Sequence, residues 1–288
     1  MLRCGLFGSR VSYLVGIDPS RSLREACYTG DEDVVLECIE RGGNVNEVGD
    51  VYENMHAICR KRHTPLMLAA SQGQLGVAHI LVEAGATIDC AGTDRTVLVV
   101  AAQMGHLDVV EFLVSCGAEI DKHDGLGTTP LFEAVTKGHI DVVCFLVRNG
   151  ANANNPNANN AYPITGAVSL GFYDIAKLLL DHGADPNQDS YAGTPLSIMC
   201  IQEPADPDDV MGFLRVILRC GGNIQKCHPL HHPLILACQS QKYTQTTIIY
   251  TLLRNDVNQI WSLHSAASAF CIASNQASPR TKKLKKSH

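Results

Sequence analysis

Apolar and polar positions along the chain follow a helical period in short, paired segments. In residues 129–154, a first segment begins at Thr129-Pro130 and ends at Gly138, and a second segment ends at Gly150. Threonine before proline is typical of a helix start, because the hydroxyl caps the helix and proline lacks an amide hydrogen that would be unsatisfied there. Glycine ends each segment because it adopts the left-handed conformation at little steric cost. The stretch therefore predicts two short antiparallel helices that share an apolar face.

The same pair of segments recurs along most of the chain. The residue that opens the first helix returns every 32 or 33 residues until a last step of 38, and the helix-ending glycines recur in phase with it. These opening residues are Pro65, Val97, Pro130, Pro163, Pro195 and Pro233. One helix pair cannot bury its apolar face alone, so we expect the copies to stack on one another.

The repeated unit resembles the ankyrin repeat, which has TPL at the start of the first helix, Gly-His between the helices and Gly-Ala after the second. The resemblance covers residues 22–258 and implies an all-α fold: an ankyrin-repeat solenoid of antiparallel helix pairs joined by β-turn or hairpin fingers. We expect about seven repeats, of which the first and last are degenerate caps. Residues 1–21 would form an N-terminal lead-in, and residues 259–288 a largely disordered tail that is basic at its end.

Four segments depart from the regular repeat. Tyr162 replaces the capping threonine, so we expect a weaker helix start there. The Asn-rich segment before it, NANNPNANN, suits a turn because asparagine tolerates positive φ. A long insertion at 47–63 is either a functional loop or a solvated one. Residues 204–209, with the sequence PADPDD, are expected to form a stiff acidic protrusion between the helices of repeat six.

The charge distribution limits the kind of partner. The net charge is −6 although residues 280–286 gather five cations, so the rest of the chain is more acidic still. Such an array suits duplex DNA poorly, because phosphate contacts require clustered lysine and arginine. We therefore expect that nucleic acid is not the main partner. The resemblance implies one or more protein partners, and we expect a monomer. The basic cluster in the tail is either a nuclear import signal or a solvated end, so the expected location is cytoplasmic, with the nucleus as the alternative.

Cysteine usage and hydropathy bound the compartment. Twelve cysteines occur, and several occupy apolar helix positions of the repeat, where a free thiol acts as a small hydrophobic group. These are Cys27, Cys38, Cys144, Cys200 and Cys238. The pattern favours a reducing compartment, and no apolar run is long enough to predict a membrane span. The first 17 residues contain two arginines and no acid, which fits either a transit peptide or a lead-in to repeat one.

Catalytic and metal-binding patterns are weak. The sequence contains no phosphate-binding glycine loop, nucleophile elbow or zinc-protease motif, so we expect neither an enzyme nor a cofactor. The recurring pairs His106/Asp108 and His139/Asp141 favour a structural role, and in the ankyrin family such histidines bond between adjacent loops. One cluster has ligand types that zinc prefers, although its spacing fits core and loop positions better. It comprises Cys220, Cys227, His228, His231, His232 and Cys238.

The resemblance also implies where partners bind. Ankyrin arrays bind proteins on a concave face that is made of the fingers and the exposed side of each first helix. Carrying the family's variable positions to this chain gives the candidate contact residues Arg60, Lys61, His63, Ser71, Gln72, Arg95, Gln103, Met104, Thr128, Thr136, Lys137, Tyr162, Leu170 and Tyr191. Arginine and tyrosine are enriched at binding hot spots, so we expect Arg60, Arg95, Tyr162 and Tyr191 to contribute most. The cationic residues among them favour a partner with acidic and apolar groups.

The function that the resemblance implies is that of a non-enzymatic adaptor or scaffold. Two alternatives remain at this point: a substrate-recognition subunit of a ubiquitin ligase, and a nuclear regulator that masks a transcription factor. The family also implies hydroxylation of the asparagine that ends a repeat, when leucine stands eight residues before it. Asn154 and Asn187 fit this pattern, whereas Asn46 has Cys38 at the leucine position.

Overall fold

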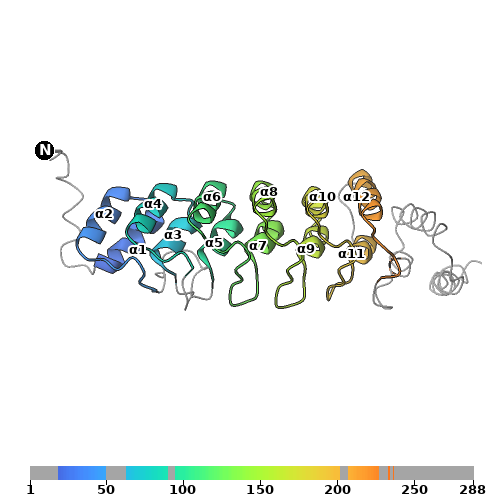
Figure 1. Ribbon diagram of the computed structural model, residues 1–288, viewed down its shortest axis with the longest axis horizontal. Coiled ribbons are helices and arrows are strands. Elements are labelled where there is room, and N and C mark those ends of the chain that lie inside the picture. The colour runs from blue at the N-terminus through green and yellow to red at the C-terminus, as the bar shows by residue number, and fades with distance from the viewer. Residues whose placement is uncertain are drawn as a thin grey trace, which may run out of the picture. The chain divides into compact units, whose positions relative to one another are not determined.

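The chain forms pairs of short antiparallel helices connected by tight turns, as the computed structural model shows (Figure 1). The structure describes residues 19–49, 63–89, 95–201 and 207–226, together with positions 233 and 236. Apart from two isolated antiparallel bridges, Gly49 with His63 and Ser190 with Gly193, the described residues contain only helices and turns. This confirms the predicted all-α repeat solenoid of helix pairs.

The described helices fall into two units divided after Asn152. The first unit contains α1 (Pro19–Thr29), α2 (Glu32–Glu40), α3 (Pro65–Ser71), α4 (Leu75–Glu83), α5 (Val97–Met104), α6 (Leu107–Ser115), α7 (Pro130–Lys137) and α8 (Ile140–Arg148). The second unit contains α9 (Pro163–Ser169), α10 (Tyr173–Asp181), α11 (Pro195–Ile201) and α12 (Pro207–Arg219). Within each unit, odd-numbered first helices form one layer and even-numbered second helices form the other (Figure 1).

Small side chains allow the first helices to pack closely on one another. Ala69 and Ala70 of α3, and Ala101 and Ala102 of α5, are fully buried, and these helices contact their neighbours more extensively than the second helices do. The second helices contribute leucines at one recurring depth, and each of these is also fully buried: Leu81, Leu113, Leu146 and Leu179. The core of each unit is therefore a seam between the two helix layers.

The helix ends follow the sequence prediction closely. The hydroxyls of Thr64, Thr96 and Thr129 each accept a hydrogen bond from the amide three residues later, at 3.1–3.2 Å. Gly105 and Gly138 end α5 and α7 in the left-handed conformation. These contacts satisfy backbone groups that helix termini otherwise leave without a partner.

The start of α9 differs from the other first helices. Tyr162 contributes no side-chain cap, as expected, but the hydroxyl of Thr165 accepts a hydrogen bond from the Tyr162 amide at 3.0 Å. This reversed contact compensates in part for the missing threonine. In the finger before it, Asn160 has a φ of 54°, which confirms that the Asn-rich segment supplies a turn with positive φ.

The two irregular segments are described only in part. Residues 207–209 form the first turn of α12, so the acidic protrusion predicted for 204–209 is wrong over its second half, because Pro207 opens the helix. Residues 202–206 lie outside the described part. At the insertion, the backbones of Gly49 and His63 pair through two hydrogen bonds, of 3.1 and 3.2 Å, while residues 50–62 lie outside the described part.

Candidate protein-binding surface

We define the contact face of each unit as the last turns of its first helices together with the tips of the fingers that precede them. Four of the predicted contact residues are exposed on this face. Met104 ends α5 with 41% of its surface exposed, and Leu170, just after α9, is 50% exposed. Lys137 at the end of α7 is also exposed, and Tyr191 at a finger tip is 91% exposed. These side chains are available to a partner without rearrangement.

Five further candidates are half-buried, and all of them take part in hydrogen bonds within the chain. They are Ser71, Gln72, Gln103, Thr136 and Tyr162. The hydroxyls of Ser71 and Thr136 donate to carbonyls within their own helices, at 2.8 and 3.0 Å. The Tyr162 hydroxyl donates to Asn160 at 3.3 Å. A partner would therefore have to compete with existing hydrogen bonds at these positions.

Burial argues against two candidates as contact residues. His63 is 5% exposed and Thr128 is 6% exposed, because both lie at the base of a finger where it joins its first helix. The Thr128 amide donates to the Asp124 carboxylate at 2.9 Å, which holds the finger closed. Arg60 and Lys61 lie outside the described residues, so they stay predictions.

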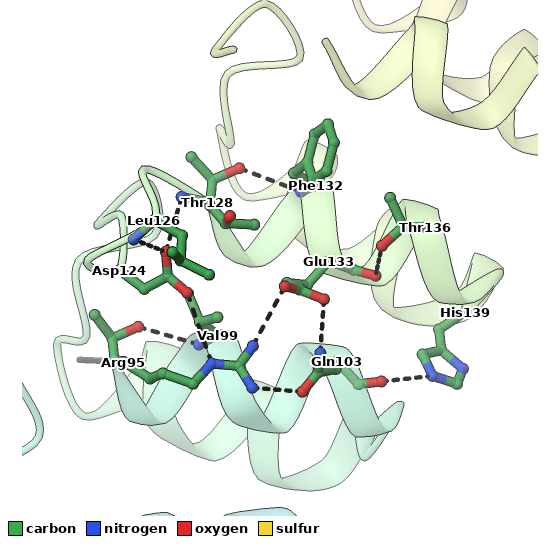
Figure 2. A network of polar contacts seen from close by, with 12 residues as sticks. Arg95, Val99, Gln103, Asp124, Leu126, Thr128, Phe132, Glu133, Thr136 and His139 are labelled. Atoms are coloured by element: carbon green, nitrogen blue, oxygen red, sulfur yellow. Dashed lines mark hydrogen bonds and ion pairs between the residues drawn. The ribbon is translucent and has the colours of Figure 1, made fainter. Parts of the chain in front are cut away.

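Arg95 occupies a buried polar network instead of an exposed position (Figure 2). Its side chain is only 12% exposed, and it connects the start of α5 to the next finger and the next first helix. The guanidinium lies 3.6 Å from the fully buried carboxylate of Asp124 and 3.3 Å from that of Glu133, and it donates to Gln103 at 2.6 Å. Gln103 in turn donates to Glu133 at 2.9 Å. Arg95 therefore positions the finger, and its contacts within the chain argue against it as a contact residue.

The finger that Arg95 supports presents an apolar residue that sequence reasoning missed. Asp124 accepts hydrogen bonds from the amides of Leu126 and Thr128, both at 2.9 Å, and Gly127 completes the turn with a φ of 69°. Leu126 at the tip is 62% exposed. The repeat phase contained the signal, because Leu126 and Tyr191 both stand three residues before the threonine at the start of a first helix. Ile201, the last residue of α11, is 51% exposed and was missed as well.

The recurring histidines join adjacent repeats. Nε2 of His106 lies 3.3 Å from the carbonyl oxygen of Ser71, and Nε2 of His139 lies 3.0 Å from that of Gln103. Each ring therefore contacts the last turn of the preceding first helix. This geometry confirms the structural role expected for these histidines.

The asparagines considered for hydroxylation bridge consecutive repeats. The amide group of Asn154 donates to the Gly183 carbonyl at 2.9 Å, and its oxygen accepts from the Asp185 amide at 2.8 Å. Asn187 makes the same two contacts with Gly221 and Asn223. Asn46 also makes this pair of contacts, with Gly85 and Thr87, although Cys38 stands where the other two repeats have leucine.

Comparison with known families agrees with this geometry. A family model described as ankyrin repeats (3 copies) matches residues 23–124 and 98–190, which together exceed half of the chain. The chain belongs to the ankyrin repeat family. Ankyrin repeats generally mediate protein–protein interactions. A comparison with curated proteins gave no match.

Neither a metal-binding cluster nor a membrane-spanning helix is found in the described part of this ankyrin protein. No group of three or more His, Cys, Asp or Glu side chains is arranged to hold a metal within the described ranges. Of the cysteines and histidines with zinc-preferred ligand types at 220–238, only Cys220 is described, and it is exposed. Among the described residues, no helix has the length and apolar character needed to cross a membrane.

The described cysteines of the ankyrin core behave mainly as apolar side chains. Cys27, Cys38 and Cys200 are buried, as predicted, whereas Cys144 is half-buried, and Cys238 lies outside the described part. Burial raises the pKa of the Cys27 thiol to about 12, and its neighbour Cys38 adds to the shift. A thiol with such a pKa stays protonated at neutral pH, so it is a poor nucleophile.

Proposed function

We propose that this ankyrin repeat protein is a non-enzymatic adaptor or scaffold that binds partner proteins through its contact faces. One observation carries the proposal. Seven large hydrophobic side chains are exposed among the described residues, and five of them belong to the contact faces: Met104, Leu126, Leu170, Tyr191 and Ile201. Exposed apolar groups that recur at the same positions of successive repeats favour an interaction surface.

The proposal predicts that partners are lost when the exposed apolar groups are removed. A full-length variant with Met104, Leu126, Leu170 and Tyr191 changed to serine should lose about tenfold or more of each specific partner, since apolar anchors supply much of the binding energy. Affinity capture from cells with quantitative mass spectrometry measures this loss. Circular dichroism confirms that the variant is folded.

The matched control carries serine at Leu36 and Ile140, which are each 47% exposed but lie on the second helices α2 and α8. It removes apolar surface of the same kind from the other layer. Equal recovery of partners by the wild type and the four-residue variant would contradict binding through the contact faces.

The identity of the captured proteins also distinguishes between the two more specific roles of an adaptor. Ligase subunits would favour a substrate-recognition subunit, and transcription factors would favour a nuclear regulator. The basic cluster at 280–286 supports the second role, because such clusters serve as import signals. We propose a cytoplasmic protein that enters the nucleus only if this cluster is recognised.

We also propose that Asn154 and Asn187 are hydroxylated by a protein asparaginyl hydroxylase. Both side chains are engaged between repeats, so the repeat must open locally before an enzyme reaches either Cβ atom. Peptide mass spectrometry of the protein from cells should find one added oxygen at each residue. Unmodified spectra at both positions would contradict the proposal, and Asn46 serves as the internal comparison.

A further inference from the structure

The contact face of the second unit has an uneven charge distribution. Its fingers and first helices, residues 153–172 and 184–201, contain two aspartates and neither lysine nor arginine. Asp185 and Asp189 are both exposed and lie on the finger that leads to α11. The described cations of this unit lie elsewhere, on the second helices and the turn after α12: Lys177, Arg215, Arg219 and Lys226.

Apolar groups on this face lie next to the acidic ones. Tyr191, which is 91% exposed, follows Asp189 by two residues at the finger tip. The two fingers of this unit are joined by hydrogen bonds, from Asn160 to the Asp189 carbonyl at 3.3 Å and from Gln188 to Asn154 at 2.7 Å. The fingers therefore present one connected edge instead of two separate loops.

The other end of the face presents further apolar groups. Leu170 and Ile201 are half exposed at the ends of α9 and α11, which pack against each other. Tyr173, three residues after Leu170, begins α10, and its pKa is raised first by burial and then by the charge of Asp209, which lies on the second helix α12. The Tyr173 ring is in turn stacked on Phe213 of α12, with ring centroids 5.3 Å apart.

We propose that the contact face of the second unit binds a protein segment that combines apolar side chains with lysine or arginine. The inference rests on the proposed adaptor function and names the chemistry of its partner. Apolar side chains would cover Tyr191, Leu170 and Ile201, and cations would face Asp185 and Asp189. This partner segment is cationic, whereas the sequence pattern at Arg60, Lys61 and Arg95 favours an acidic partner. Of these three residues, Arg95 is engaged in contacts within the chain.

Selection of random displayed peptides on the immobilised full-length chain tests the inference. The enriched peptides should carry net positive charge and several apolar residues. A labelled enriched peptide should bind the triple variant Leu170→Ser, Tyr191→Ser and Ile201→Ser at least about tenfold more weakly. Its affinity should also fall as salt is added, because exposed charges are screened.

A charge variant keeps the test valid if the triple variant does not fold. Asp185→Asn with Asp189→Asn leaves the apolar groups intact, and we expect about fivefold weaker binding from the lost attraction. Asp181→Asn is the matched control, because it removes one exposed carboxylate from the end of α10 and should leave the affinity unchanged.

Three results would overturn the inference. These are enrichment of acidic peptides, absence of any enrichment, and unchanged affinity in both the triple and the charge variants. If the enriched peptide is lost instead with serine at Met104 and Leu126, the adaptor function stands and only the assignment to the second unit fails. If no variant changes the capture of partner proteins from cells, the adaptor proposal itself fails.

Discussion

Replacing Arg95 with alanine is expected to lower the free energy of unfolding by about 3 kcal/mol, since removing one member of a buried ion pair leaves the other charge without compensation. The Asp124 side chain is fully buried and the Glu133 side chain is 15% exposed, so neither carboxylate is readily hydrated after the change. Urea unfolding followed by circular dichroism measures the loss.

Arg148→Ala is the matched control for Arg95→Ala. Arg148 is an exposed arginine in the last turn of α8, and its removal should change stability by less than about 0.5 kcal/mol. Arg95→Lys should fall between the two, because lysine keeps the charge but lacks the planar fork that contacts three partners at once. If Arg95→Ala were as stable as Arg148→Ala, the network in Figure 2 would contribute nothing to the fold.

The Arg95 network couples the stability of the protein to the position of the Leu126 finger. Asp124 holds the turn that presents Leu126, and Arg95 holds Asp124. A change at Arg95 would therefore disturb the finger and lower stability together. Loss of a partner in such a variant would not identify Arg95 as a contact residue, which is why the binding variants leave it intact.

Replacing Gly105 with alanine is expected to lower the free energy of unfolding by about 2–3 kcal/mol, because two penalties add. Gly105 has a φ of 79°, which strains any residue with a Cβ atom. The added Cβ would also lie 2.5 Å from Nδ1 of His139 and displace the ring from the Gln103 carbonyl. Thermal and urea unfolding measure the loss.

Gly117→Ala separates the two penalties. Gly117 has a φ of 91°, but a Cβ atom there would meet nothing within 4 Å, so only the backbone strain of about 1 kcal/mol applies. His139→Ala combined with Gly105→Ala removes the clash, so the double variant should lose less stability than the two single changes added together. Equal losses for Gly105→Ala and Gly117→Ala would show that the imidazole adapts without cost.

Local chemistry in the sequence determines most of the fold of this protein. Threonine before proline, and glycine at the end of each helix, act within a few residues and repeat in phase, so the helix pairs and their stacking follow from the sequence directly. The hydrogen bonds of Thr64, Thr96 and Thr129, and the left-handed Gly105 and Gly138, bear this out. Exposure of Met104 and Tyr191 also followed from their place in the repeat.

Only the tertiary structure decided which polar residues face solvent. Arg95 and Thr128 stand at positions where the repeat allows variation, but Arg95 meets acids 29 and 38 residues away, at Asp124 and Glu133, and Thr128 closes a finger. Such pairings depend on how successive repeats stack, and no local pattern encodes them. The hydrogen bond from the Tyr162 amide to the Thr165 hydroxyl, which partly replaces the missing threonine cap, was also missed. The reason is that a side chain inside the helix can bond back to the capping residue as well as the reverse. Helix ends follow from neighbouring residues, whereas the burial of a charge depends on the partners that the fold brings to it.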